Sequence, residues 1–296
     1  MTAWNRAILI LMAILLLFTS FVLSSFAVQS GQSAPVPAAT PALQQPAGNT
    51  AEPAATPDLG PEPTPEPTPE PTPEPTPEPT PEPEPLPASF FDDAAFLGDS
   101  ISGTLEYYGN HNDGLGKALF LVRVDYSLHA ALDGSMLVEY GGQYMRPEEA
   151  VELSGATKLF IMMGAMGDIA SEGIDQTMDN WARLIANIRS RCPQLRIYIQ
   201  SCTPLSARGE TNKLNNAMVD EYNARLKTFA EENDCVYVTI GENFKDENGA
   251  LPDKYCRDNY AHLRIDAGAY WAELLRDPVN YSISPWEDYR LSGLDS

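Results

Sequence analysis

Apolar residues gather in five short runs between residues 94 and 240. They span residues 94–97, 119–124, 159–163, 197–199 and 236–240. The runs do not alternate apolar and polar positions in the way of a half-buried strand, and this is typical of strands that are buried on both faces. They therefore predict the strands of a sheet at the centre of a layered domain.

A second pattern, with apolar residues three or four positions apart, fills segments between these runs. It predicts helices around residues 181–188 and 214–229 and over residues 267–275. The apolar faces of the first two are Trp181, Leu184, Ile185 and Ile188, and Leu214, Ala217, Met218, Tyr222, Leu226 and Phe229. Strands separated by such helices are joined by right-handed crossovers, so the order predicts an α/β domain with a parallel sheet and helices on both faces.

The chain ahead of this domain begins with an apolar segment. Residues 7–28 are an uncharged apolar run of 22 residues, which is long enough to cross a hydrocarbon core of about 30 Å. Residues 1–28 are therefore predicted to be a membrane anchor or a signal peptide cleaved near Ala27. We favour the anchor, with Arg6 inside and the rest of the chain outside, because the run is long and a long spacer follows it.

That spacer, residues 29–88, has almost no large apolar residues and is predicted to be a linker without tertiary structure. Every second residue is proline from Pro61 to Pro85, which favours polyproline II at about 3.1 Å per residue. We interpret the linker as a stiff tether that reaches into or through a cell wall. The remaining residues, 89–296, have the size of one domain.

The charge of the chain narrows the choice of partners. The net charge is −22, and residues 89–296 hold 32 acidic and 18 basic residues, a difference of −14. Such a field repels phosphate backbones and anionic headgroups, so nucleic acid is not an expected partner. A neutral acylated sugar or small ester fits the field better.

Cysteine and histidine usage is sparse. The four cysteines allow either buried free thiols or two disulfides, of which Cys192–Cys235 and Cys202–Cys256 are the pairs that the predicted strand order favours. Their spacing does not suit zinc and the chain has three histidines, so neither a metal centre nor another cofactor is expected.

The first predicted strand leads directly into a glycine turn that presents Ser100. Near the other end of the chain, Asp258 and His262 lie four residues apart in a polar segment. One loop could therefore place His262 against Ser100, with Asp258 orienting the imidazole, which is the arrangement used for acyl transfer. His111 lies in a polar turn and His129 in a stretch that we interpret as lacking a nearby acid, so both are expected to be structural.

Gly98-Asp99-Ser100 after the first strand, the later Asp and His before the last helix, and their order resemble the SGNH (GDSL) hydrolases. The resemblance covers about residues 89–296. It implies a three-layer, flavodoxin-like sandwich with a five-stranded parallel sheet, and serine esterase activity with Ser100, His262 and Asp258 as nucleophile, base and orienting acid.

Three departures from the family pattern affect the predicted site. The family completes its oxyanion hole with an asparagine after the third strand, where this chain has residues 164–168 as Gly-Ala-Met-Gly-Asp. Backbone N–H groups of Ser100, Gly164 and Gly167 are therefore the candidate oxyanion donors. The family acid also stands three residues before the histidine, a position that Asn259 holds here. A family glycine after the second strand has no clear match near residues 125–127.

Taken together, the sequence predicts a membrane-tethered, extracytoplasmic serine esterase that removes O-acyl groups, such as acetyl, from cell-wall or extracellular carbohydrate. An O-acetyltransferase with the same serine is one alternative. A catalytically impaired glycan-binding module is another, because the oxyanion asparagine is missing.

Overall fold

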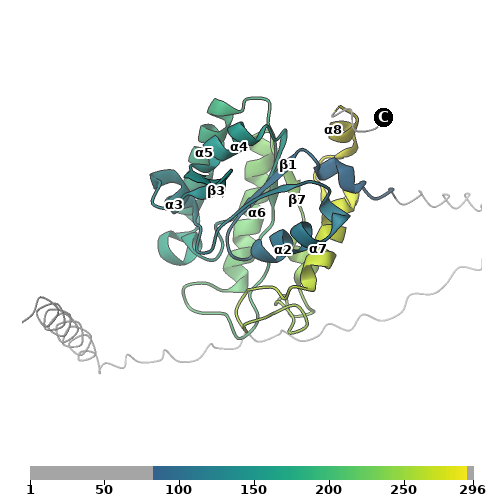
Figure 1. Ribbon diagram of the computed structural model, residues 1–296. Helices are drawn as coiled ribbons and strands as arrows, with labels where there is room; N and C mark the ends of the chain where they lie inside the picture. The colour runs from purple at the N-terminus through teal and green to yellow at the C-terminus, as the bar shows by residue number, and fades with distance from the viewer. Residues whose placement is uncertain (1–82, 292–296) are drawn as a thin grey trace, which may run out of the picture. The chain divides into compact units, whose positions relative to one another are not determined.

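The computed structural model describes residues 83–291, and these form a sheet enclosed by helices (Figure 1). The strands are β1 (Ala94–Gly98), β2 (Leu119–Val122), β3 (Val138–Tyr140), β4 (Gln143–Met145), β5 (Lys158–Met162), β6 (Arg196–Gln200) and β7 (Val236–Val238). The α-helices are α2 (Gly103–His111), α3 (Leu128–Asp133), α4 (Pro147–Ser154), α5 (Asp168–Arg191), α6 (Asn216–Glu232), α7 (Ala267–Arg276) and α8 (Trp286–Leu291). Short 3-10 turns are η1 (Ala88–Phe91), η2 (Asp113–Leu115), η3 (Gly241–Phe244) and η4 (Pro278–Asn280).

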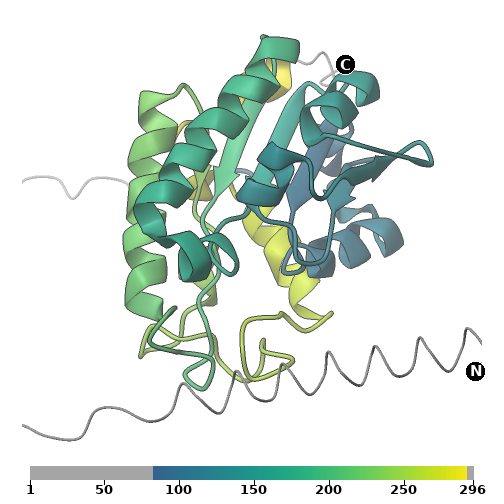
Figure 2. The ribbon, with the colours of Figure 1, turned by 90° about the vertical axis from the view of Figure 1, so that its left-hand side faces the viewer.

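Five parallel strands make the main sheet, in the order β2-β1-β5-β6-β7. This confirms the α/β fold, the parallel sheet and the five strands predicted from the sequence. Helices α2 and α7 contact each other on one face, and α5 and α6 contact each other on the other (Figures 1 and 2). The chain passes from β1 to β2 on one side and returns to β5 on the other, so the strand order reverses beside β1. Ligand sites of open α/β sheets form at the carboxyl ends of strands at such a reversal.

The core of the sheet is built around a row of aromatic rings. Phe96, Phe160 and Tyr198 occupy paired positions on β1, β5 and β6, and their ring centroids lie 4.8 Å and 4.3 Å apart in stacked geometry. Phe120 of β2 continues the row at 5.2 Å from Phe96. Offset aromatic pairs contribute about 0.5–1.5 kcal/mol each beyond their burial, so the row ties four strands into one rigid support.

A buried ion pair closes the edge of the sheet opposite the carboxyl ends. Lys158, the first residue of β5, is almost fully buried; its ammonium group binds the Asp93 carboxylate and lies 4.9 Å from the centroid of the Phe90 ring. A charge in such a place is tolerated only because it is paired and hydrogen-bonded.

Three features differ from the sequence-based expectation. A small antiparallel hairpin, β3–β4, was not predicted, and neither were α3, α4 and α8. The packed region also begins before residue 89, because Leu86 is fully buried and its backbone N–H donates to Arg276 O at 2.7 Å. The predicted anchor, residues 1–28, and most of the predicted linker lie outside the described residues. None of the helices between residues 83 and 291 has the length and apolar character that crossing a bilayer requires.

Candidate active site

Ser100 lies in a tight turn between the carboxyl end of β1 and the start of α2. Asp99 stabilises this turn, because its carboxylate accepts the Ile101 N–H at 2.9 Å and its carbonyl accepts the Ser102 N–H at 3.1 Å. A Cβ on Gly98 would lie 2.1 Å from Ser102 Oγ and 3.2 Å from Met162 O. Only glycine therefore lets the chain turn this closely. Helix α2 begins directly after this turn, at Gly103.

A second loop, between η3 and α7, carries His262. Cys256 and Leu263 form an isolated antiparallel bridge, and the Arg257 N–H donates to His262 O at 2.8 Å, which closes the base of the loop. The Thr104 hydroxyl of α2 donates to Leu263 O at 3.1 Å. This bond fixes the histidine loop to the helix that follows Ser100, so the two halves of the site are held by one contact.

The structure brings the three sequence-predicted residues into a continuous chain of contacts. His262 Nε2 lies 2.9 Å from Ser100 Oγ, and His262 Nδ1 lies 2.5 Å from Asp258 Oδ2. In the tautomer with the proton on Nδ1, that nitrogen donates to Asp258 and leaves Nε2 free to accept from the serine hydroxyl. The arrangement suits proton removal from Ser100 during nucleophilic attack.

Asp258 is held in place by its own loop. Its Oδ1 accepts backbone N–H groups of Tyr260 at 2.9 Å, Ala261 at 3.2 Å and His262 at 3.3 Å. Partial burial raises the pKa of Asp258, but the hydrogen bonds from the His262 ring and from Tyr260 N–H outweigh it, and the net pKa is below the usual value. The carboxylate is thus kept ionised beside the imidazole.

Asn259 accounts for the extra residue between the acid and the histidine. It adopts φ 60°, a left-handed conformation that asparagine tolerates better than most residues. Its side-chain Oδ1 accepts from Arg208 Nη1 at 2.9 Å and its carbonyl accepts from the Ser206 hydroxyl at 2.6 Å. The Asn259 amide is therefore engaged with Arg208, and the carboxylate on His262 is that of Asp258.

Ser100 and His262 open into a cavity of about 230 Å³. It is also lined by Asp99, Asp125, Tyr126, Met166, Gly167 and Tyr260. The lining therefore has two further carboxyl groups and neither lysine nor arginine. A larger cavity of about 500 Å³ beside Pro83, Pro85 and Arg276 is lined by no histidine, serine or cysteine, so it lacks a nucleophile and base.

Asp99 is a buried acid in the wall of this cavity. It is 8% exposed, and burial raises its pKa from 3.8 to about 6, against the opposing effects of the Ile101 N–H and of His262. Sequence analysis gave Asp99 a structural role only. Its position in the wall beside the nucleophile became visible with the fold.

The candidate oxyanion donors do not all reach the cavity. Ser100 and Gly167 line it, and their backbone N–H groups donate no hydrogen bond within residues 83–291. Gly164, by contrast, is buried away from the lining: it has φ 98°, and a Cβ there would lie 2.1 Å from the Tyr222 hydroxyl. Of the three candidate donors, Ser100 and Gly167 therefore line the cavity and Gly164 does not.

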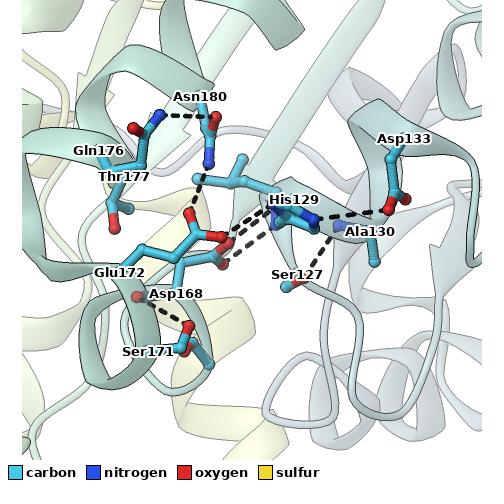
Figure 3. A network of polar contacts seen from close by, with 12 residues as sticks. Ser127, His129, Ala130, Asp133, Asp168, Ser171, Glu172, Gln176, Thr177 and Asn180 are labelled. Carbon is cyan, nitrogen blue, oxygen red and sulfur yellow. Dashed lines mark hydrogen bonds and ion pairs between the residues drawn. The ribbon is translucent and has the colours of Figure 1, made fainter.

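The loop that carries Gly167 is anchored by Asp168, the first residue of α5. Its buried carboxylate accepts the N–H groups of Leu128 at 3.0 Å and His129 at 3.1 Å, which are the first residues of α3 (Figure 3). Burial raises the pKa of Asp168, although these two hydrogen bonds lower it. The bonds fix the ends of β2 and β5 relative to each other.

His129 belongs to this anchor and is not close to Ser100. Its ring contacts Glu172 at 2.8 Å and Asp133 at 3.5 Å, as Figure 3 shows. The sequence-based view that it lacks a nearby acid is wrong: Asp133 lies one helical turn away on α3, and Glu172 comes from α5. His111 hydrogen-bonds the Tyr107 carbonyl at 2.7 Å and stacks on its ring.

The four cysteines are free thiols in this structure, so neither proposed disulfide is present. Cys202 is buried, and its Sγ lies 3.4 Å from Met163 O.

Sequence analysis did not predict four residues of the cavity wall, namely Asp125, Tyr126, Met166 and Tyr260. Tyr260 could have been found from its place between Asp258 and His262. Among residues 83–291, no group of three or more His, Cys, Asp or Glu side chains could hold a metal ion.

Comparisons with known proteins agree with this geometry. Residues 96–265, more than half of the chain, match the model of the GDSL-like Lipase/Acylhydrolase family. No curated protein matches the chain significantly.

Among solved structures, a Streptococcus pneumonia protein provisionally named a platelet activating factor is 21% identical, with TM-score 0.50, over 62% of this chain and 82% of its own. This likeness shows a shared fold. A GDSL-like lipase from Bacteroides thetaiotaomicron (18% identity, TM-score 0.47, 62% of this chain and 84% of its own) also matches. So does the C-terminal catalytic domain of a Streptococcus pneumoniae peptidoglycan O-acetyltransferase (15% identity, TM-score 0.43, 62% and 89%).

Proposed function

We propose that this chain removes small O-acyl groups from extracytoplasmic carbohydrate. The premise is that it belongs to the GDSL-like lipase/acylhydrolase family and is therefore a serine esterase of the acylhydrolase type. Acetyl groups on cell-wall or extracellular sugars are the proposed substrates. The observation that carries the proposal is the Ser100–His262–Asp258 chain of contacts at the mouth of a small cavity.

The proposed reaction proceeds through an acyl-enzyme. Ser100 Oγ forms a bond to the ester carbonyl carbon while its proton passes to His262 Nε2. Asp258 accepts the Nδ1–H and stabilises the imidazolium. The ester C–O bond then breaks, and His262 gives the proton to the departing alcohol oxygen. A water molecule then gives a proton to the same nitrogen and attacks the acyl carbon. The bond from this carbon to Ser100 Oγ breaks, the carboxylic acid leaves, and His262 returns the proton to Oγ.

Negative charge on the carbonyl oxygen needs hydrogen-bond donors. We assign this role to the backbone N–H groups of Ser100 and Gly167, which line the cavity without partners among the described residues. The family asparagine has no counterpart in the wall, where the Met166 side chain lies instead. Loss of one oxyanion donor costs roughly a hundredfold to a thousandfold in turnover, so the enzyme should be slow unless its backbone donors compensate.

Cavity size and charge support a small, uncharged acyl ester. About 230 Å³ is below the roughly 300–1,000 Å³ of common ligand pockets. Asp99 and Asp125 in the wall, without a cationic neighbour in the lining, disfavour phosphate- or carboxylate-bearing substrates. This feature, together with the net charge of the domain, supports an acylated neutral sugar over an anionic lipid.

Location is the second part of the proposal. The apolar run at residues 7–28 would anchor the chain in the membrane, and the proline repeat from Pro61 to Pro85 would hold the domain outside it. At about 3.1 Å per residue that repeat would extend roughly 80 Å. Fractionation tests this: we expect the full chain in the membrane fraction and a chain that lacks residues 1–82 in the soluble fraction. A mature soluble form beginning at Val28 would overturn the anchor.

A fluorophosphonate probe with mass mapping tests the nucleophile. We expect labelling of Ser100 in the purified protein and none in Ser100→Ala, while Ser190→Ala, a change on the exposed end of α5, should still be labelled. Asp258→Asn should lose less turnover of p-nitrophenyl acetate than His262→Ala, and Asn259→Ala less still. Labelling elsewhere, or a greater loss in Asn259→Ala than in Asp258→Asn, contradicts the assigned roles.

Acetylated sugar oligomers test the substrate. Release of free acetate supports hydrolysis, whereas transfer of the acetyl group to a sugar acceptor in place of acetate release would favour the transferase. An enzyme that cleaves p-nitrophenyl acetate but no acetylated sugar has a different substrate class.

A further inference from the structure

A second hollow is lined by residues that directly precede part of the active-site lining in the chain. It measures about 390 Å³ and is lined by Val122, Arg123, Val124, Met136, Glu139 and Tyr144. These residues come from the end of β2, the turn after it, the loop between α3 and β3, which holds Met136, and the β3–β4 hairpin. The hairpin is the element that neither the sequence pattern nor the parallel sheet accounts for.

The hollow is continuous in sequence with the catalytic cavity. Arg123 and Val124 line the hollow, and the next two residues, Asp125 and Tyr126, line the cavity that holds Ser100. Asp125 has φ 57°, a left-handed conformation. The backbone therefore turns at the residue where the lining of the hollow ends and the lining of the active-site cavity begins. Consecutive Cα atoms are about 3.8 Å apart, so the step from Val124 to Asp125 places the hollow beside the cavity, within reach of a substrate that extends beyond the acyl ester.

The surface of the hollow combines apolar and polar groups in about equal measure. Val124 is 66% exposed and Tyr144 is 62% exposed. The Arg123 guanidinium lies 5.6 Å from the centroid of the Tyr144 ring, and its Nη1 donates to Leu137 O at 2.7 Å. Glu139 faces Tyr144 across the hairpin. Single exposed apolar residues are ordinary, but these two share one concave surface beside a catalytic centre.

This combination of groups suits a sugar ring better than an acyl chain. A sugar has an apolar face of C–H groups that packs on an aromatic ring, and hydroxyl groups at its edge that bond to carboxylate and guanidinium groups. An acyl chain would leave Arg123 and Glu139 facing hydrocarbon, which is costly for charged groups.

We propose that this hollow is a subsite for a sugar unit of the same glycan chain, next to the unit whose acyl group lies at Ser100. The proposal rests on the proposed function and extends it from a single acylated sugar to an oligomer. Tyr144 is the specificity-determining residue and Val124 its apolar partner, while Arg123 and Glu139 bind hydroxyl groups.

The test compares catalytic efficiency on acetylated β-1,4-linked N-acetylglucosamine oligomers with that on p-nitrophenyl acetate. For Tyr144→Ala, the ratio of kcat/KM on the tetramer to that on the small ester should fall about tenfold, mainly through KM, which corresponds to about 1.4 kcal/mol. Tyr144→Phe keeps the ring and should keep the ratio. Val279→Ala is the matched control. Val279 is an exposed apolar residue in η4 that lines neither the active-site cavity nor this hollow, so its replacement should leave both activities unchanged.

Each result decides between distinct explanations. If the wild type acts on the oligomers and Tyr144→Ala leaves the ratio intact at every length, the subsite is refuted while the proposed function stands. If the variant instead loses selectivity along a series of p-nitrophenyl esters of increasing acyl length, the hollow binds acyl chains and the glycan proposal is refuted. If the wild type cleaves the small ester but none of the oligomers, the proposed substrate fails and the subsite with it.

Discussion

Replacing Asp99 with asparagine should stabilise the protein at neutral pH and not at acidic pH. Asp99 is 8% exposed and its Oδ1 accepts the Ile101 N–H at 2.9 Å. An asparagine side chain keeps an acceptor oxygen for that bond. What the change removes is the cost of holding a buried negative charge, which is the first cause of the raised pKa of Asp99.

The magnitude follows from the pKa of Asp99 in the folded state. Burial raises this pKa from 3.8 to about 6, a difference of about two pKa units. One pKa unit corresponds to about 1.36 kcal/mol, so holding the buried negative charge costs about 3 kcal/mol of folding stability. Between these two values the folded state binds more protons than the unfolded state, so the stability that this group contributes falls as pH rises. The gain from Asp99→Asn is therefore close to zero below pH 4 and reaches about 3 kcal/mol above pH 6.

Urea denaturation followed by tryptophan fluorescence measures this difference. Trp181 and Trp271 are fully buried, so their emission should report global unfolding. Midpoints for wild type and variant should coincide at pH 4 and separate progressively up to pH 7.5, with equal slopes against urea. Parallel stability curves across this range, or a variant that is less stable at pH 7.5, would refute the assignment of a buried, high-pKa carboxyl to this position.

Three further predictions follow from the same structure. Ser100→Ala and His262→Ala should each abolish nearly all turnover of p-nitrophenyl acetate, and the double variant should lose little more, since the two act as a unit; additive losses would contradict this. Asp93→Ala should lower the free energy of unfolding by about 3–5 kcal/mol because it leaves the buried Lys158 ammonium unpaired, and adding Lys158→Met should recover much of it in thermal unfolding; no recovery would mean that the charge is not the cause. Gly167→Asn should raise kcat with little change in KM by restoring an oxyanion donor; a Cβ there meets only Ser127 Cβ at 3.7 Å, so the variant should fold, and unchanged kcat would show that the backbone donors already suffice.

The central sheet was predictable because β1, β5 and β7 are buried along their whole length, and strands buried on both faces are rich in apolar residues. The β3–β4 hairpin was not, because each of its strands has three residues and mixes Val138 with Glu139 and Tyr140, so no period can be recognised. The acid beside His262 was predicted from the sequence as Asp258, although the family spacing falls on Asn259. The structure adds what Asn259 does instead: its backbone is left-handed and its amide oxygen accepts from Arg208.

Contacts between segments that are distant in the sequence were also not predictable. Asp168 next to the first turn of α3, and Glu172 against the His129 ring, join residues about forty positions apart. No local pattern signals such a pairing. The same holds for Leu86, which looks like the end of a proline-rich linker in sequence and is buried in the fold.

The attachment of Leu86 to α7 has a mechanical consequence. Its N–H and carbonyl are both bonded to Arg276, at 2.7 Å and 2.8 Å, at the last residue of a helix whose first residue follows the histidine loop. Tension from the preceding chain therefore enters the domain at the end of α7 remote from His262. The force acts first on the two hydrogen bonds between Leu86 and Arg276, which break before the histidine loop moves. The length of α7 thus separates the catalytic contacts from the point where the force is applied.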